Sequence, residues 1–275
     1  MWSGDCHQSD GMKTTIADDT KIREIGRGKF AVVYLAQDKN KAIWTAQKVS
    51  PDKTMLRREA GLLQRINHPL FANFCDYYET AEEGVLCMEY IPGSRLDQMV
   101  ESRGSLGLKQ TIRIAMEIAD GLRYLHEMDT PMVCRDVKPE HVIIRQDGRV
   151  KLVDLGCAGV AGDRSIAGSR GYAAPEQFLG KCACGTYSDV YGLGRVMEFM
   201  HPQKDFAIWR ELLKSCTESR VECRIPDMND LLKRLILLEE KSRLAEKGWF
   251  GVRRRIVNRD HYLKHYYLEK SICMY

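Results

Sequence analysis

Short runs that alternate between apolar and polar residues fill the first third of the chain. Two such runs flank a glycine-containing turn at residues 25–36, a third lies at 42–49, and two more follow at 74–78 and 85–90. These runs are rich in β-branched and aromatic residues, and a period of two with that composition is typical of strands. The pattern predicts a β-rich first region.

In the rest of the chain, and in one segment of the first region, apolar residues recur with a period close to 3.6 residues. They predict helices at 57–66, 96–100, 111–126 and 231–238, and another that begins at 188–194. The run at 111–126 is the longest of these, so we expect it to be the central buried helix. A β-rich region followed by a mainly helical one predicts an α+β fold.

One hairpin carries chemistry at its end. The runs 142–144 and 150–153 are joined by an Asp-Gly turn at 147–148, which is a strong hairpin signal. Asp136 precedes the first strand and Asp154 follows the second, so the hairpin brings together two carboxylates that are 154 − 136 = 18 residues apart. Such a pair suits metal binding or acid–base catalysis, although two turn-forming aspartates would give the same spacing.

Length and composition limit the class of protein. The 275 residues exceed one small domain, and 44% hydrophobic with 29% charged residues is ordinary for a globular chain. The formal charge of +4, from 42 basic and 38 acidic residues, is too balanced to favour nucleic acid as the main partner. We see neither a signal peptide nor a transmembrane segment, so we expect a cytoplasmic protein.

The ten cysteines are scattered and not packed into a small disulfide framework, which favours reduced thiols. Cys182 and Cys184 could form half of a metal site, but no second close pair of Cys or His follows them. We therefore favour free thiols in a loop.

Three ordered motifs resemble those of eukaryotic-type (Hanks-type) Ser/Thr protein kinases. Residues 134–141, CRDVKPEH, resemble the catalytic loop, 154–156, DLG, resemble the metal-binding motif, and 174–176, APE, resemble the end of the activation segment. Residues 25–36 are similar to the Gly-rich loop, with Ala31 where a third glycine usually stands. The run GYAAPEQ and the short activation segment look like those of small soluble bacterial members.

The resemblance covers about residues 20 to 240 and implies a two-lobed protein kinase-like fold. We expect a flexible arm at 1–15, a small β-rich N-lobe at 16–90, a larger mainly helical C-lobe at 91–240, and a basic and aromatic tail at 241–275. The tail could contact an acidic partner or a membrane surface, or its aromatic residues could pack on the chain's own domain.

The resemblance also implies an ATP pocket between the lobes. Lys48 would pair with the α- and β-phosphates and with Glu59, whereas a solitary strand lysine would otherwise be a solvated residue. Met88 would stand at the back of the pocket, and the backbone of Glu89 and Ile91 would bind the base. The implied nucleotide-binding residues are Gly26, Gly28, Val33, Ala46, Lys48, Glu59, Met88, Glu89, Ile91 and Ile143.

For catalysis, the resemblance implies that Asp136 is the base for a substrate hydroxyl and that Lys138 steadies the transferred phosphoryl group. Lys48 completes the catalytic set. Asp154 would hold Mg²⁺ (or Mn²⁺) on the phosphates of ATP. A lysine at 138 resembles the Ser/Thr-directed subgroup, so the implied substrates are protein Ser/Thr hydroxyls, including those of the chain itself.

Three departures affect this interpretation. Cys134 replaces the usual histidine and, as a small hydrophobe, is expected to loosen the packing without loss of chemistry. Leu155 replaces phenylalanine and keeps an apolar contact. His141 stands where the family has an asparagine that binds the second metal, and imidazole suits Mn²⁺ or Zn²⁺ better than Mg²⁺. The retained catalytic residues favour an active kinase, with a pseudokinase or nucleotide-binding scaffold as the alternative. Residues 174–176 disfavour a small-molecule kinase of the aminoglycoside type.

The activation segment offers two serines. Ser169 matches a residue that contacts the catalytic Asp and Lys, which leaves Ser165 as a candidate phosphorylation site whose phosphate Arg135 could bind, or as a plain small loop residue. Two further contacts are architectural: Glu176 with Arg224 is one, and Asp189 holding the catalytic-loop backbone is the other.

Overall fold

The alternating first region of the chain folds into a five-stranded antiparallel sheet with the order β1-β2-β3-β5-β4. The strands are β1 (Thr20–Arg27), β2 (Val32–Gln37), β3 (Trp44–Ser50), β4 (Phe74–Glu79) and β5 (Gly84–Glu89). The amide of Gly28 donates to the carbonyl of Ala31 at 2.9 Å and closes the turn between β1 and β2. The prediction of a β-rich first region is confirmed.

The computed structural model describes residues 20–37, 43–179, 183–202 and 206–246. The arm predicted for 1–15, most of the tail predicted for 241–275 and Cys182 lie outside these ranges. Residues up to Leu238 belong to one unit, and those from Glu239 onward belong to another.

Helix α1 (Lys53–Leu63) begins four residues before the predicted start and ends three before the predicted end. Its start is set by Asp52, whose side chain accepts a hydrogen bond from the amide of Met55 at 2.9 Å. The apolar period alone did not reveal this cap. The helix packs against β4 and β5, and its buried face includes Leu56, Leu62 and Leu63.

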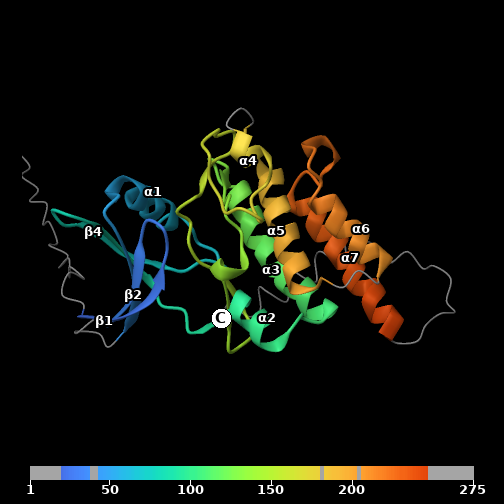
Figure 1. Ribbon diagram of the computed structural model, residues 1–275, viewed down its shortest axis with the longest axis horizontal. Coiled ribbons are helices and arrows are strands. Elements are labelled where there is room, and N and C mark those ends of the chain that lie inside the picture. The colour runs from blue at the N-terminus through green and yellow to red at the C-terminus, as the bar shows by residue number, and fades with distance from the viewer. Residues whose placement is uncertain (1–19, 38–42, 180–182, 203–205, 247–275) are drawn as a thin grey trace, which may run out of the picture. The chain divides into compact units, whose positions relative to one another are not determined.

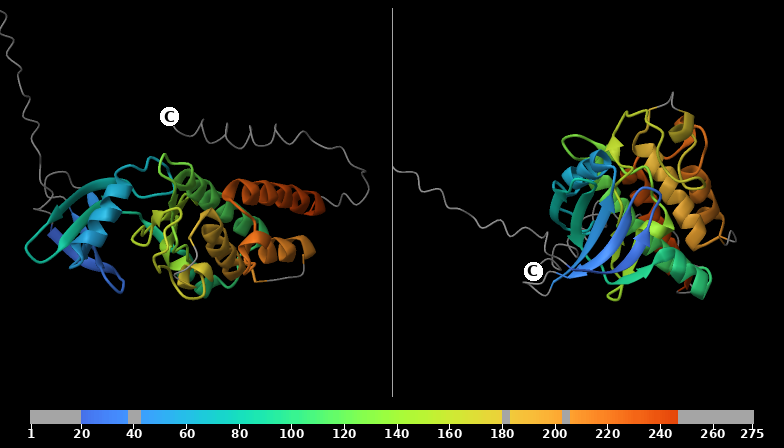
Figure 2. Two further views of the ribbon diagram at one scale, coloured as in Figure 1. Left: turned by 90° about the horizontal axis from the view of Figure 1, so that it is seen from above. Right: turned by 60° about the vertical axis from the view of Figure 1, so that its left-hand side comes forward.

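The second region is mainly helical, as predicted. Its helices are α2 (Leu96–Arg103), α3 (Leu108–His126), α4 (Glu176–Leu179), α5 (Thr186–Met200), α6 (Ala207–Cys216) and α7 (Met228–Glu246). In Figure 1 the five-stranded sheet and α1 lie on one side, whereas α3, α5 and α6 gather on the other, and the left view in Figure 2 keeps this separation. Ile114, Ile118 and Leu122 of α3 are fully buried, so α3 is the central helix that the sequence predicts.

The predicted hairpin is confirmed as β8 (Val142–Arg145) and β9 (Val150–Leu152), which pair antiparallel with Val142 opposite Leu152. The turn places Gly148 at φ +81°, a conformation that favours glycine. Strand β6 (Gly93–Arg95) joins the other edge of β8. The amide of Leu152 donates to the carbonyl of Leu70 at 2.7 Å and ties this hairpin to the segment that follows α1. Two short strands, β7 (Met132–Val133) and β10 (Gly159–Val160), form a separate pair.

Within the part of the chain that the structure describes, no helix is both long and apolar enough to cross a membrane. The seven cysteines of this part are free thiols. Cys184 is among them and is buried.

Two helical glycines, Gly121 and Gly61, differ in whether the structure has room for a side chain. A Cβ on Gly121 of α3 would lie 2.1 Å from Leu70 Cδ2 and 2.7 Å from its Cβ, whereas a Cβ on Gly61 of α1 would meet no atom within 4 Å. We expect Gly121→Ala to lower the free energy of unfolding by about 1–3 kcal/mol. We expect Gly61→Ala to raise it by up to about 1 kcal/mol. Urea unfolding of both variants tests this, and equal stability of the two would contradict it.

Candidate active site

A buried ammonium group joins three elements of the site. Lys48 Nζ on β3 lies 3.0 and 2.7 Å from the two carboxylate oxygens of Glu59 on α1. It lies 2.8 Å from Oδ1 of Asp154, just after β9. Burial disfavours the charged lysine, but the two carboxylates outweigh burial and raise the pKa of Lys48. The Lys48–Glu59 pair predicted from the sequence is present.

The backbone of the predicted catalytic loop is held by a residue that lies far away in the sequence. Arg135 has φ +65°, in the left-handed region that a non-glycine residue rarely adopts. Asp189 of α5 accepts hydrogen bonds from the amides of Cys134 and Arg135, both at 2.8 Å, and contacts His126 Nε2 at 2.8 Å. The predicted tether by Asp189 is therefore confirmed, and it offsets the cost of the left-handed backbone.

Asp136, Lys138 and Ser169 converge beside this loop. Lys138 Nζ donates to Ser169 Oγ at 2.8 Å and lies 3.3 Å from Asp136 Oδ2. The Ser169 contact with lysine is as the sequence predicts. The other oxygen, Asp136 Oδ1, is buried and has no hydrogen-bond partner among the described residues. A buried carboxylate oxygen without a donor is costly, and a hydroxyl donor would satisfy it.

His141 faces both aspartates. Its Nδ1 lies 3.1 Å from the carbonyl oxygen of Asp136, which can only accept, so Nδ1 carries the proton. Burial lowers the pKa of His141, and the lone pair of the neutral ring is then on Nε2, which lies 3.6 Å from Asp154 Oδ2. Asp154 Oδ1 is already bonded to Lys48 and to the amide of Gly156, so Oδ2 is the oxygen left for another partner.

One metal ion could bind Nε2 of His141 and Oδ2 of Asp154 together, since each bond would be about 2.1 Å. The described residues contain no group of three or more metal-binding side chains. A metal here would need further oxygen ligands, and nucleotide phosphates supply such oxygens in many phosphotransferases. One imidazole and one carboxylate suit a borderline divalent metal at least as well as Mg²⁺.

Strand register places five of the predicted nucleotide-binding residues on one face of the sheet: Gly26, Val33, Ala46, Lys48 and Met88. Val33 pairs with Lys48, Gly26 with Val33, and Ala46 with Met88. Gly28 lies in the turn beside Gly26, Ile91 follows β5, and Ile143 on β8 pairs with Arg95. The amide of Glu89 donates to the carbonyl of Asn73 at 2.9 Å, so this amide is not open to a base.

The side chain of Glu89 has an interaction that the sequence did not reveal. Its Oε2 accepts from Asn73 Nδ2 at 3.1 Å and from the buried ammonium of Lys151 on β9 at 3.1 Å. Lys151 also donates to the carbonyl of Phe71 at 2.9 Å. This network connects the end of β5 to the β8–β9 hairpin.

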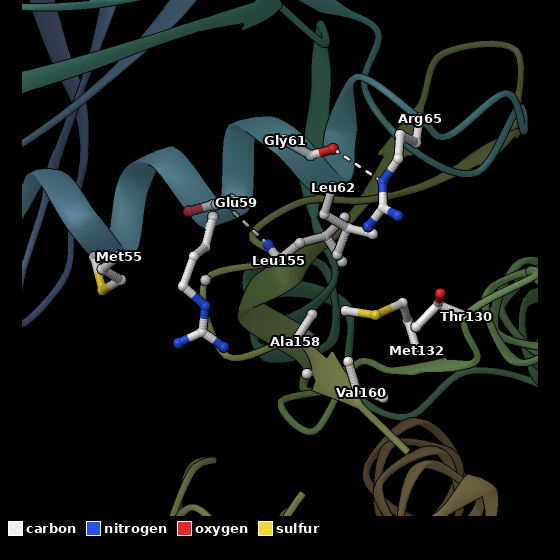
Figure 3. A pocket seen from close by; sticks show the side chains of 13 residues that line it. Met55, Glu59, Gly61, Leu62, Arg65, Thr130, Met132, Leu155, Ala158 and Val160 are labelled. Atoms are coloured by element: carbon white, nitrogen blue, oxygen red, sulfur yellow. Dashed lines mark hydrogen bonds between the residues drawn. The ribbon is translucent and has the colours of Figure 1, made fainter.

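A cavity of about 380 Å³ lies beside the Lys48 cluster, between α1 and residues 155–160. Figure 3 shows Leu62 and Met132 pointing into it, and the amide of Leu155 donating to Glu59 Oε1 at 3.1 Å. At the edge of this cavity, Glu59 connects α1 both to Lys48 and to the backbone of Leu155.

Buried polar groups fix the end of the activation segment. Arg224 binds both oxygens of Glu176, at 2.6 and 3.0 Å, as predicted. Gln177 was missed by the sequence reasoning: its Nε2 donates to the carbonyl of Arg135 at 2.7 Å. Asp163 was also missed, and it forms an ion pair with Arg135 at 3.0 Å. A single polar residue carries no sequence signal for a partner 28 or 42 residues away.

A small β-sheet and a mainly helical region, with a buried strand lysine that binds the aspartate after the β8–β9 hairpin, define a kinase-like nucleotide-binding domain. A family model described as the protein kinase domain matches residues 20–247. The "Probable serine/threonine-protein kinase MRK1 homolog" of Encephalitozoon cuniculi is 31% identical over 192 residues, which are 66% of this chain and 59% of that protein. Calcium/calmodulin-dependent protein kinase type IV of Rattus norvegicus is 28% identical over 244 residues, 81% of this chain and 51% of that protein.

The chain therefore belongs to the protein kinase family. It spans little more than half the length of these two relatives. The resemblance to small bacterial members stays a prediction.

The Glu176–Arg224 pair predicts a pH effect on stability. Burial is the largest single effect and opposes ionisation of Glu176, but the hydrogen bonds and positive charge of Arg224, with the hydrogen bonds from the backbone and Ser188, together lower the pKa of Glu176. Stability from a lowered carboxyl pKa is fully present above the unfolded pKa and is lost as the pH falls through the folded pKa. We expect Glu176→Gln to cost about 3–5 kcal/mol at pH 7, because it leaves Arg224 buried without a counter-charge.

The difference from wild type should shrink as the pH falls below about 4.5. Urea unfolding from pH 7 to pH 3 measures it, with the exposed Glu222→Gln as control. A difference that stays constant over this range would contradict the prediction.

Proposed function

We propose that this protein transfers the γ-phosphate of ATP to Ser or Thr hydroxyls of proteins, including its own. The observation that carries the proposal is the buried, unpartnered Asp136 Oδ1 beside Lys138 and Ser169. An acceptor hydroxyl that donates to this oxygen would satisfy it and would be oriented for attack. The relative from Encephalitozoon cuniculi is named a probable serine/threonine-protein kinase, which supports protein hydroxyls as the substrates.

In this proposal each charged residue has one task. Lys48, fixed by Glu59, neutralises the phosphates that are not transferred. Lys138 lies beside Asp136 and offsets charge on the transferred phosphoryl group. Phosphoryl transfer depends mainly on positioning and charge neutralisation, and these groups supply both. Asp136 takes the proton of the acceptor hydroxyl.

The metal that accompanies ATP would be held by Asp154 and His141, and it would neutralise charge on the phosphates. The free Asp154 Oδ2 and the lone pair on His141 Nε2 support both residues as ligands. Because imidazole is a softer ligand than the amide oxygen usual in the family, we propose that Mn²⁺ supports transfer better than Mg²⁺. The predicted cytoplasmic location and a partner for the basic tail stay predictions.

Transfer of label from ATP to the protein itself and to a generic basic protein tests this function, with Mg²⁺ and Mn²⁺ in parallel. We expect Asp136→Ala to abolish transfer while ATP still raises its unfolding temperature, because Asp136 makes no contact with Lys48. We expect His141→Asn to raise the ratio of Mg²⁺- to Mn²⁺-supported rate on the order of tenfold.

No label with either metal in the folded wild type, together with an ATP-induced rise in unfolding temperature, would replace the kinase by a nucleotide-binding scaffold. Label that persists in Asp136→Ala would show that another residue, or a contaminating kinase, is the source. An unchanged metal ratio in His141→Asn would remove His141 from the metal site.

A further inference from the structure

The guanidinium of Arg135, next to the proposed base, is almost entirely buried: its side chain is 4% exposed. Its Nε donates to the carbonyl of Cys157 at 2.6 Å, and its Nη1 donates to Asp163 Oδ2 at 3.0 Å and to Ser165 Oγ at 2.8 Å. A buried guanidinium without a counter-charge is strongly destabilising. Among the described residues, Asp163 is the carboxylate that forms an ion pair with Arg135.

Asp163 is itself held in place. Its Oδ1 accepts from the amide of Ser165 at 2.9 Å, and its Oδ2 accepts from Ser165 Oγ at 2.8 Å. Its amide donates to the carbonyl of Val160 at 3.0 Å, and its carbonyl accepts from the amide of Cys184 at 2.9 Å. The hydrogen bonds from Ser165, together with Arg135, lower the pKa of Asp163, so the carboxylate is charged at neutral pH.

Arg135 transmits this contact to the catalytic loop. Its amide donates to Asp189 and its carbonyl accepts from Gln177, while its φ is +65°. The side chain of the same residue reaches Cys157 and Asp163 in the activation segment. Arg135 therefore links the backbone that positions Asp136 to the activation segment. This link requires an anion next to the guanidinium of Arg135.

We propose that Asp163 is this anion, a positioning residue that orders the activation segment without phosphorylation. The inference rests on the proposed kinase function and deepens it. Ser165 is the nearest hydroxyl, and its Oγ lies 2.8 Å from Asp163 Oδ2. A phosphate there would place two anions against one guanidinium, and like charges repel at this distance. Phosphorylation of Ser165 is therefore not the activating event, and it lowers the rate.

The test compares wild type, Asp163→Asn, Asp163→Glu and Ser165→Ala, each treated with phosphatase and confirmed by mass spectrometry to be unphosphorylated before ATP is added. Asp129→Asn, an exposed aspartate before β7, is the matched control. Initial rates give kcat and KM for ATP, and the unfolding temperature of each variant checks that it is folded.

We expect the unphosphorylated wild type and Ser165→Ala to keep at least half of the activity of untreated wild type. In Asp163→Asn, kcat should fall on the order of 10- to 100-fold, the loss that misplacement of a catalytic group produces. KM for ATP should stay within about twofold of wild type, because Lys48 and its partners are untouched. Asp163→Glu should restore most of kcat, since the negative charge is kept.

Loss of activity on dephosphorylation, or a kcat of Asp163→Asn equal to that of Asp129→Asn, would overturn the inference and leave the kinase function intact. If no preparation transfers phosphate, the proposed function fails, and hydrogen exchange decides the inference separately. The amides of Ser165 and Cys184 should be protected in unphosphorylated wild type and should exchange faster in Asp163→Asn. Equal rates in both proteins would overturn the inference.

Discussion

The buried ammonium of Lys48 is the interaction on which the rest of the site depends. An uncompensated charge in this position would be prohibitively costly, so the fold must deliver Glu59 from α1 and Asp154 from the end of β9 to the same point. The two ion pairs of Lys48 thus connect α1 and the end of the β8–β9 hairpin to strand β3. Asp154 reaches Lys48 with φ +72°, a strained conformation that is held by Lys48 and by the amide of Gly156.

The catalytic loop is irregular backbone inside the protein, and its buried backbone N–H and C=O groups need hydrogen-bond partners. The partners come from outside the loop: Asp189 on α5 for two amides, and Gln177 of α4 for the carbonyl of Arg135. The Glu176–Arg224 pair then anchors the start of α4. Side chains on α4 and α5 therefore help to position Asp136. Loss of one of these hydrogen bonds would shift the backbone of the catalytic loop and with it Asp136.

The departures from the family pattern fall at positions where this scaffold tolerates them. Cys134 is buried and contributes its amide to Asp189, a bond that does not depend on the side chain. Leu155 is buried, and its amide bonds to Glu59 whatever side chain it carries. His141 differs from both, because its side chain itself faces Asp154. Substitution at 141 changes the chemistry offered to a metal, whereas the other two change only packing.

The sequence alone determined the features that depend on neighbours in the chain. The β8–β9 hairpin follows from alternation around an Asp-Gly turn, α3 follows from its apolar period, and the resemblance to kinase motifs indicated Lys48, Asp136 and Asp154 as site residues. The start of α1 was misplaced because a cap formed by Asp52 outweighs the apolar period. Only the tertiary structure decided the ion pair of Asp163 with Arg135, the hydrogen bond from Gln177 and the network around Glu89. Backbone periodicity is a local property that can be counted along the chain, whereas a buried charge selects its partner only after folding has excluded water and fixed which elements meet.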